Sequence, residues 1–544
     1  MFQRKMGMKK LSLIVSLFCI SSIAFAQSQT SRIDKTLTIY TDVMRQLDMA
    51  YVDTLNYELL LETGINSMLK KVDPYTVYYP KQQNEDLKRL TTGKYGGIGA
   101  LIMQRDNYVF IADPYEGMPA QKNGIQAGDK ILEVDGWQAK DKTTSEVSQH
   151  LRGIPNSIIK LRLEREGVEK PFVIEFKREE IHLATVEYSG VVAPKIGYIL
   201  FSEFTEHSAD EFQLALSELV NKHNIEKLII DLRGNGGGLI DEAVKIINLF
   251  VEKNTEVVST LGKDESNKRV YKTISEPKYK DMPLVILVNE QTASAAEILA
   301  GAMQDLDRAI IVGTRTYGKG LVQNIRPIAF DGHLKVTTAK YYIPSGRCIQ
   351  AIDYSRRRKD GSVEHVPDSL THEFKTKNGR IVKDGGGISP DILSADTADK
   401  VNICYSLYKK NMFFDYATRF HLTTPSIPPA TTFEITDSIM ADFEQFLKEK
   451  DFTYETETSK YFKDMLEMAH HEDIDSTALK QLEQFSHLLN PSFHDAISRQ
   501  HEAVAEQLGA EIISRYFYQR GRTCYLLRTD KELKQAIDAF NITL

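Results

Sequence analysis

Ser294 and Lys319 have the residue types and the spacing of a nucleophile and its base. Ser294 lies in the segment QTASAAEIL, between an apolar run over residues 283–288 and a helical pattern that begins at about Ala295. Its hydroxyl would lie beside the unpaired N–H groups of a helix start, where a developing oxyanion is best stabilised. Because a serine is a weak nucleophile at its free pKa, it needs a base. The pair therefore suggests acyl transfer, although a packed serine and a loop lysine would give the same pattern.

Lys319, 25 residues after Ser294, is the better candidate for the base. Glycines around it in TYGKG let the backbone approach closely, and the amine could be desolvated by nearby apolar strands. The pKa of a buried lysine can fall to about 7–8, which suits a general base. The alternative is a histidine, but residues 183–364 contain only three, and none lies in a small-residue or glycine-rich segment. A Ser–Lys dyad is a known variant of the nucleophile and base pair.

The elements that must hold this pair form a βαβ unit. Residues 283–288 and 309–312 are apolar runs that predict buried strands, and residues 295–306 carry a helical pattern. Such a unit has parallel strands that are covered on both faces. Upstream, KLIIDLRGNGGGLIDEAVKIINLFV predicts another strand, a glycine loop and a helix, and SADEFQLALSELVNKH predicts a helix capped by Ser208.

A phosphate-binding motif is nearly complete in the same stretch. Residues 313–319, GTRTYGK, fit the first seven positions of the P-loop G-x-x-x-x-G-K-[ST]. The eighth residue, which should help to hold magnesium, is Gly320, and an extended pattern follows where a P-loop needs a helix. We therefore expect no nucleotide to bind.

TASAAEI and RAIIVGTRTYGKGLVQ together resemble the core of the carboxyl-terminal processing proteases, the tail-specific serine peptidases of the PDZ-containing S41 family. The resemblance implies that Ser294 is the nucleophile, that Lys319 is the base and that Gln323 orients the lysine. No Cys or His cluster has zinc-ligand spacing and no H-E-x-x-H motif occurs, so we expect no metal and no other cofactor. Asp305 falls on an aspartate that is common in the family, with a less clear role. Thr292 stands where serine is frequent, but it is not the matched nucleophile.

The glycine loop DLRGNGGG resembles the DLRxNxGG loop of the same family. Its glycines would let backbone N–H groups face a tetrahedral intermediate, so we assign Gly237 or Gly238, with the N–H of Ala295, to the oxyanion hole. A tight strand-to-helix turn would have similar glycines, and the sequence does not distinguish which glycine donates. The resemblance spans about residues 60–393 and implies an α/β fold with a crotonase-like (ClpP/crotonase-type) peptidase core at residues 179–395.

Residues 94–178 resemble a PDZ domain inserted ahead of that core. The resemblance is carried by GIQAGDKILEVDG and by the glycine-rich KYGGIGALIMQ. Such a domain binds a peptide C-terminus as an added strand, here beside Leu101, while backbone N–H groups of a loop take the carboxylate. The residues that we assign to this loop are Gly96, Gly97, Ile98 and Gly99. A PDZ domain that only gates the active site is the alternative.

The N-terminus has the parts of a secretory signal peptide. Basic residues precede a short apolar run that ends in Ala24-Phe25-Ala26, so cleavage is expected before Gln27. An uncleaved membrane anchor is the alternative, but the run is shorter than a full span. We therefore expect an exported, periplasmic protein, with membrane association left open. Without the four basic residues of this segment, 64 basic and 75 acidic residues remain, a net charge of −11, so nucleic acid is not an expected partner.

Helical patterns flank the two central domains. Residues 27–93 have apolar side chains at helical spacing, and residues 396–544 contain amphipathic helices without a catalytic signal. The C-terminal helices could pack on the core, form a homodimer contact or hold a partner, with packing as the default.

Together these patterns predict an exported serine endopeptidase that recognises unfolded or flexible C-terminal tails through its PDZ domain and cleaves them with a Ser–Lys dyad. The alternative is a non-catalytic tail-binding module or chaperone on the same fold. The presence of Ser294, Lys319 and Gln323 argues against this alternative. No motif identifies the natural substrate, or tells whether the PDZ domain activates or inhibits the core.

Overall fold

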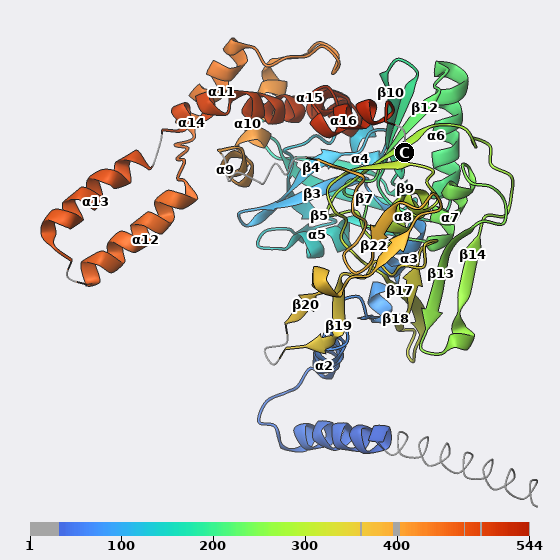
Figure 1. The fold of residues 1–544 in the computed structure, drawn as a ribbon. Helices are drawn as coiled ribbons and strands as arrows, with labels where there is room; N and C mark the ends of the chain where they lie inside the picture. The colour runs from blue at the N-terminus through green and yellow to red at the C-terminus, as the bar shows by residue number, and fades with distance from the viewer. Residues whose placement is uncertain (1–31, 359–361, 395–402, 473, 490–491, 543–544) are drawn as a thin grey trace, which may run out of the picture. The chain divides into compact units, whose positions relative to one another are not determined.

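Five stretches of the chain are described by the computed structural model: residues 32–358, 362–394, 403–472, 474–489 and 492–542 (Figure 1). The signal peptide expected at residues 1–26 lies outside them. Within the described stretches, no helix is both long and apolar enough to cross a membrane. The chain forms two compact units, Met1–Pro74 and Tyr75–Leu544.

The first unit is helical where it is described. One helix covers residues 32–50, and α2 (Tyr57–Leu69) begins after Asn56. The Asn56 side chain accepts a hydrogen bond from the N–H of Leu59 at 3.0 Å, which satisfies one of the donors that a helix start leaves free. Within the predicted helical region over residues 27–93, the described residues 32–74 thus contain two helices, and residues 27–31 lie outside the described residues.

A six-stranded sheet forms the centre of the second unit. Its strands in spatial order are β10 (Val186–Ala193), β11 (Ile196–Phe201), β12 (Lys227–Asp231), β15 (Leu284–Val288), β16 (Ile310–Gly313) and β23 (Ile392–Leu393). β10 is antiparallel to β11, and all the other neighbours are parallel. The predicted βαβ unit is confirmed, because β15 and β16 are parallel neighbours connected through α8 (Ala295–Asp305).

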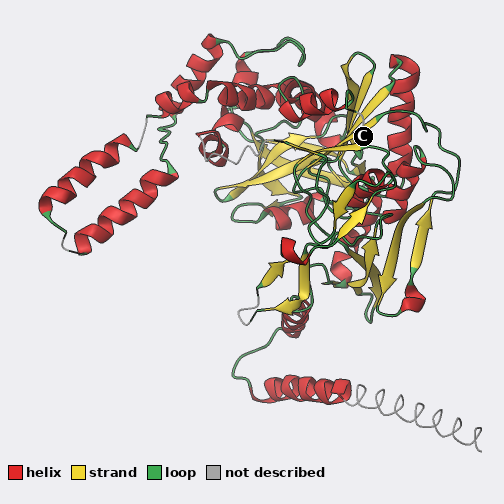
Figure 2. Cartoon of the chain, in the orientation of Figure 1, coloured by secondary structure: helices red, strands yellow, loops and turns green. Residues whose placement is uncertain are grey.

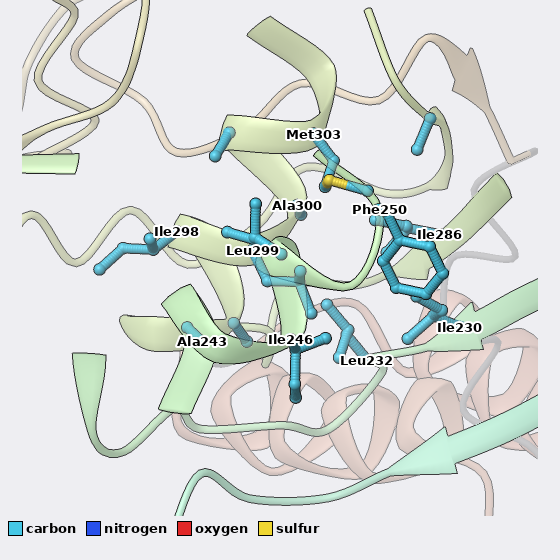
Figure 3. Close-up of a cluster of buried hydrophobic side chains, with 14 of the residues drawn as sticks. Ile230, Leu232, Ala243, Ile246, Phe250, Ile286, Ile298, Leu299, Ala300 and Met303 are labelled. Atoms are coloured by element: carbon cyan, nitrogen blue, oxygen red, sulfur yellow. The ribbon is translucent and has the colours of Figure 1, made fainter. Parts of the chain in front are cut away.

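Alternate residues of this sheet enter two separate cores. Ile230 and Ile286 pack in the cluster shown in Figure 3, whereas Ile229 and Val285, their neighbours in sequence, belong to a second cluster. Successive strand residues point to opposite faces, so a sheet that is buried on both faces has continuous apolar runs. The first cluster includes residues of α6 (Ser208–His223), α7 (Ile240–Asn248) and α8, and the second includes residues of α16 (Lys531–Ala539).

Helix α6 corrects one prediction, because Ser208 is not its cap. The cap residue is His207, and Ser208 is the first helical residue, fully buried. Glu242 of α7 accepts a hydrogen bond from the N–H of Ala209 at 2.9 Å. A carboxylate from a neighbouring helix thus satisfies a donor that a local cap would otherwise take.

A second sheet carries the residues that follow Lys319. Its strands are β1 (Val77–Tyr79), β18 (His333–Tyr342), β13 (Glu256–Gly262) and β14 (Arg269–Lys272), with β17 (Leu321–Pro327) also paired to β18. The segment after Lys319 is therefore a strand, as predicted, whereas a P-loop would be followed by a helix. β1 was not predicted: it lies in the stretch expected to be helical, pairs with β18 and precedes α3 (Asn84–Thr92). Two further two-stranded sheets are formed by β19 (Ile352–Arg357) with β20 (Val363–His365) and by β21 (Glu373–Lys375) with β22 (Ile381–Lys383).

The PDZ domain has its own sheet and its own core. The sheet contains β3 (Ala100–Arg105), β4 (Tyr108–Pro114), β5 (Lys130–Val134), β7 (Ile158–Glu164) and β8 (Phe172–Lys177), with β6 (Trp137–Gln138) on β5 and the helices α4 (Pro119–Lys122) and α5 (Thr144–Leu151). β3 is at one edge of this sheet. The entry strand β2 (Lys94–Gly97) pairs with the exit strand β9 (Glu179–His182), as expected for a domain inserted into the chain.

The C-terminal region is helical, as predicted (Figure 2). Its helices are α9 (Ile403–Lys409), α10 (Met412–Thr423), α11 (Asp437–Glu449), α12 (Glu457–His471), α13 (Ser476–Leu488), α14 (Phe493–Arg499), α15 (His501–Leu526) and α16. An apolar core joins α9, α10, α11, α14 and α15. Helix α16 supplies the buried side chains of Leu533, Ala536 and Ala539 to the core of the central sheet, and that connection was not predicted in detail.

Candidate active site

Ser294 is the residue before α8, at the end of a tight turn over residues 289–294, the nucleophile turn. Its backbone has φ 58° and ψ −118°, which a residue other than glycine rarely adopts. The N–H of Ala295, the first helical residue, has no acceptor among the described residues. Strain of this kind persists only where the surroundings impose it, and it is common at functional sites.

Glu297, in the first turn of α8, fixes the nucleophile turn. Its side chain is fully buried, and its carboxylate accepts four hydrogen bonds: from the N–H groups of Ser294 (2.9 Å), Gly318 (2.7 Å) and Lys319 (2.8 Å), and from the hydroxyl of Thr316 (2.6 Å). One carboxylate thus joins the nucleophile turn to residues 314–320, the base loop. Burial raises the pKa of Glu297 to about 7, although the four donors favour the ionised form.

Lys319 is half-buried, and its Nζ lies 4.5 Å from the centroid of the Tyr75 ring. This is the geometry of a cation–π contact, which restrains the amine. The backbone before it is also restrained: Gly318 has φ 82°, and a Cβ there would lie 2.4 Å from Cβ of Ala351. The base loop therefore needs glycine at this position.

Gln323 lies on β17, four residues after the lysine. Its side-chain amide donates to Oγ1 of Thr337 on β18 at 3.1 Å. This bond fixes the side chain on the sheet that follows the base loop. Its role in orienting Lys319 stays a prediction.

Asp305 has a role in the fold. The residue ends α8, and its buried carboxylate pairs with the buried guanidinium of Arg347 at 2.8 Å. It also accepts the N–H of Ser345 at 3.0 Å. Asp305 therefore ties the C-terminal end of α8 to a distant loop.

The glycine loop that follows β12, residues 232–239, lies against the nucleophile turn, and we call it the oxyanion loop. A Cβ on Gly237 would lie 2.6 Å from Cβ of Ser294 and 2.8 Å from N of Ala295, so only glycine permits this approach. The N–H of Gly237 donates to Oδ1 of Asn235 at 2.8 Å. The N–H of Gly238, by contrast, has no acceptor among the described residues.

One buried side chain, that of Thr292, and one backbone hydrogen bond lock the oxyanion loop to the nucleophile turn. Thr292 donates from Oγ1 to the carbonyl of Leu232 at 2.8 Å and accepts the N–H of Asn289 at 3.0 Å. The carbonyl of Asn235 accepts the N–H of Ala293 at 2.9 Å. The hydroxyl at position 292 thus has a structural role, which threonine fills as well as the serine that is frequent there.

The predicted catalytic residues face one cavity of about 980 Å³. The cavity is also lined by Leu101 from the PDZ domain and by Gln519 from α15, so the parts of the second unit meet around it. Its size is at the upper end for a ligand pocket. The predicted site residues on its wall are Ser294, Lys319, Gln323, Gly237, Gly238 and Leu101.

The predicted tail-binding residues lie at the open edge of the PDZ sheet. Leu101 is on the edge strand β3 and is half exposed. Gly96 and Gly97 are part of β2 and pair with β9, so the loop before β3 consists only of Ile98 and Gly99. The N–H groups of Ile98 and Gly99 have no acceptor within the part of the chain that the structure describes.

Glu297, Tyr75 and Asn235 were not assigned from the sequence. Glu297 had a usable signal, because Ser294-Ala-Ala-Glu297 has the S-x-x-E spacing of a capping box, in which the acidic side chain accepts the N–H of the cap residue. Asn235 is within the recognised loop motif, but its buried hydrogen bonds are visible only in the structure. Tyr75 comes from a distant segment and had no signal.

Three family models match the chain. Peptidase family S41 matches residues 195–355, a PDZ domain matches residues 96–175, and the model described as probable PDZ-protease, C-terminal helical domain, matches residues 403–540. The three matches fall in the peptidase core, in the PDZ sheet and in the C-terminal helices.

Curated relatives agree with these matches. The carboxy-terminal-processing protease of Bartonella bacilliformis is 36% identical over 339 residues, which cover 61% of this chain and 77% of that protein. A probable CtpA-like serine protease of Staphylococcus aureus is 33% identical over 344 residues, covering 62% of this chain and 68% of the relative. The solved photosystem II D1 C-terminal processing protease is 28% identical, with a TM-score of 0.33, and covers 59% of this chain and 78% of its own. The chain therefore belongs to the S41 family of serine peptidases, among the carboxy-terminal-processing proteases that carry a PDZ domain.

Proposed function

We propose that this serine peptidase is an exported endopeptidase that captures flexible C-terminal tails with its PDZ domain and cleaves them with a Ser294–Lys319 dyad. The observation that carries the proposal is the common cavity. Ser294, in a strained turn at a helix start, faces the same cavity as Lys319 and as Leu101 of the PDZ edge strand. A bound tail could therefore reach the nucleophile without leaving the cavity.

In the proposed reaction, Oγ of Ser294 attacks the carbonyl carbon of the scissile bond while Nζ of Lys319, in its neutral form, takes the hydroxyl proton. The carbonyl π electrons move to the oxygen and form the tetrahedral oxyanion. As the C–N bond breaks, the ammonium of Lys319 returns the proton to the leaving amine. Water then attacks the ester, again through Lys319, and releases the acid and the free serine. Gln323 would keep the lysine in place.

The oxyanion would be bound by the N–H groups of Gly238 and Ala295. The free N–H of each residue supports this assignment, whereas the N–H of Gly237 already donates to Asn235. Both donors are backbone groups of anchored segments, so they would need little reorganisation during the reaction. Gly237 is needed instead for the close contact between the oxyanion loop and Ser294.

Tail capture would add the peptide as a strand beside β3, with its carboxylate on the N–H groups of Ile98 and Gly99. The open edge of β3 and the free N–H groups support this mode. The partners would be unfolded or flexible protein tails. The same proposal includes a crotonase-like fold for the peptidase core.

Export rests on the sequence of residues 1–26, with a periplasmic location after cleavage. The domain limits that go with this proposal are an N-terminal helical region over 27–93, the PDZ domain over 94–178, the core over 179–395 and the C-terminal helices over 396–544. A homodimer is compatible with this arrangement.

The test uses residues 27–544 and an unfolded reporter with an apolar tail, made with either a free or an amidated C-terminus. The wild type should cleave the free-tail reporter faster, and both Ser294→Ala and Lys319→Ala should abolish cleavage while the tail still binds. Intact mass over time gives the cleavage, and fluorescence anisotropy of the labelled tail gives the binding. Wild-type protein that binds the tail without cleaving it would instead support the non-catalytic tail-binding function.

A further inference from the structure

Arg233, at the start of the oxyanion loop, connects this loop to the C-terminal end of the chain. Its guanidinium donates to Asp231, which ends β12, at 2.5 and 3.0 Å. It also donates to Asp530 at 2.6 Å and to Glu532 at 2.7 Å. Three carboxylates therefore surround one arginine whose side chain is only 20% exposed.

Asp530 and Glu532 are held firmly in turn. Asp530 is the cap of α16 and accepts the N–H of Leu533 at 2.9 Å, and Glu532 accepts a hydrogen bond from the hydroxyl of Ser394 at 2.6 Å. Leu533 is buried against the central sheet, and Ala536 and Ala539 are buried there too. The start of α16 is therefore a rigid support for Arg233.

Neutralising the buried Asp231 does not by itself explain this arrangement. Asp231 is 1% exposed, and it already accepts hydrogen bonds from the guanidinium of Arg233 and from the hydroxyl of Tyr198 at 2.6 Å. The additional carboxylates of Asp530 and Glu532 leave an excess of negative charge around the arginine. Their remaining effect is geometric, since they fix the direction in which the Arg233 side chain leaves the oxyanion loop.

The backbone that follows Arg233 leads directly to the proposed donors. The N–H of Gly234 donates to Oδ1 of Asn289 in the nucleophile turn at 3.0 Å, and the N–H of Gly237 donates to Asn235 at 2.8 Å. Gly234, Gly237 and Gly238 all have positive φ values, so the path of this loop is set by its anchors and not by intrinsic preference. Arg233 is the anchor at its start.

We propose that Asp530 and Glu532 are positioning residues of the active site, which hold Arg233 and thereby the N–H of Gly238 in the oxyanion hole. The C-terminal helix α16 is on this account a required part of the peptidase core, although it comes from the helical region. This inference rests on the proposed function, because the oxyanion hole belongs to it.

The test is the double variant Asp530→Asn with Glu532→Gln in the chain from residue 27. Asparagine caps a helix as well as aspartate does, and glutamine can still accept from Ser394, so the variant removes charge and keeps the local hydrogen bonds. A misplacement of about 1 Å at a reacting centre costs roughly 100-fold in rate, so kcat should fall by roughly 10- to 100-fold while KM changes less than about twofold. Affinity for a peptide boronate, which mimics the tetrahedral state, should fall by the same factor.

The matched control is Glu511→Gln, which removes another partly buried carboxylate of the helical region that pairs with Arg515 and Arg522. It should leave kcat unchanged. The single variant Asp530→Glu retains the negative charge, so it should keep most of the wild-type activity. If the double variant is folded and has wild-type kcat and boronate affinity, or if the control loses as much, the inference is wrong.

Amide hydrogen exchange separates this inference from the proposed function. Peptides covering residues 232–239 should exchange faster in the double variant than in the wild type or in Glu511→Gln. A wild type without cleavage would contradict the proposed function, and the exchange result would then still decide whether α16 orders the loop. If the double variant does not fold, the single variant Glu532→Gln takes its place. It should show smaller losses of kcat and boronate affinity and faster exchange of residues 232–239, and unchanged exchange in this variant would overturn the inference.

Discussion

The base loop and the oxyanion loop both contact the nucleophile turn, but the residues that hold the two loops lie at different distances along the sequence. The base loop is joined to the nucleophile turn by Glu297, three residues after Ser294, through a fully buried carboxylate. The oxyanion loop is held in part by Asp530 and Glu532, which are 297 and 299 residues away from Arg233 in the sequence. The base loop is thus held by a residue that is near in sequence and that accepts hydrogen bonds from uncharged donors. The oxyanion loop is held by ion pairs with residues that are distant in sequence.

This difference determines what each support responds to. The donors to Glu297 are backbone N–H groups and a hydroxyl, so only the protonation state of the carboxylate itself changes that support. The support at Arg233 depends on ion pairs that are partly exposed, which respond to salt and to the docking of α16. Changes at the two sites should therefore be separable by experiment.

The largest effect is expected from Glu297→Gln. Glutamine has one acceptor oxygen and an NH₂ group that would face the existing donors, so the nucleophile turn and the base loop both lose their shared anchor. We expect kcat to fall by roughly 1,000-fold, since two reacting groups are displaced together. Steady-state cleavage of a tail peptide measures this.

Glu242→Gln is the matched control. Glu242 is also a buried glutamate in the first turn of its helix, and it accepts a backbone N–H, but it does not contact the nucleophile turn. Its replacement should affect stability more than kcat. Equal losses of activity in the two variants would contradict a specific role for Glu297.

The second prediction concerns pH. The pKa of Glu297 is about 7 in the native state, against ~4.3 for glutamate in an unfolded chain. Between these values the native state keeps a proton that the unfolded chain has lost, so the contribution of Glu297 to the free energy of unfolding decreases as pH rises from about 4.3 to about 7, by about 4 kcal/mol in total. Urea unfolding of the wild type and Glu297→Gln at pH 4.5 and pH 8 gives the difference. A difference that does not change with pH would mean that the four donors keep Glu297 ionised throughout.

A smaller effect is expected from Thr292→Val, which has nearly the same shape but no hydroxyl. The carbonyl of Leu232 and the N–H of Asn289 would lose a buried partner, which should lower the free energy of unfolding by about 2 kcal/mol. The oxyanion loop would move relative to the nucleophile turn, so kcat should fall by about tenfold. Chemical unfolding and kinetics on Thr292→Val and Thr292→Ser measure both, and Thr292→Ser should be close to the wild type. Full activity of Thr292→Val would show that the hydrogen bonds of Thr292 are not needed to position the oxyanion loop.

The smallest effect is expected from salt. The Asp530 and Glu532 side chains are 16% and 27% exposed, so their pairs with Arg233 are only partly screened. Raising ionic strength from about 0.05 to 0.5 M should lower wild-type kcat by less than about twofold, and it should have no such effect on the double variant that lacks both carboxylates. If salt lowers kcat equally in both proteins, the effect does not come from these pairs.

Much of the site was encoded by short-range patterns in the sequence. The apolar runs over residues 283–288 and 309–312 and the helical pattern between them predicted a βαβ unit, and β15, α8 and β16 confirm it. These elements are predictable because each strand is buried on both faces, and α8 is buried along its whole length, which leaves a strong apolar pattern.

The remaining contacts depend on residues that are far apart in sequence. We predicted a helical region where the structure has β1. A strand of three residues is too short to give a recognisable hydrophobic pattern, and β1 is stabilised by its pairing with β18. The ion pairs of Arg233 involve ordinary surface residue types at the start of a C-terminal helix, so no local signal distinguishes them. Ser208 was predicted as a cap from its type and position, but Glu242 from another helix satisfies a donor at that helix start.

The identity of the nucleophile and its base is tested most directly with a fluorophosphonate probe, which reacts with an activated serine. Intact mass and peptide mapping should find a single adduct, on Ser294, in the wild type and none in Ser294→Ala. The rate of labelling should fall at least ~100-fold in Lys319→Ala, because general-base catalysis contributes about 10²- to 10⁴-fold. An adduct on another serine, or an unchanged labelling rate in Lys319→Ala, would contradict the Ser294–Lys319 dyad.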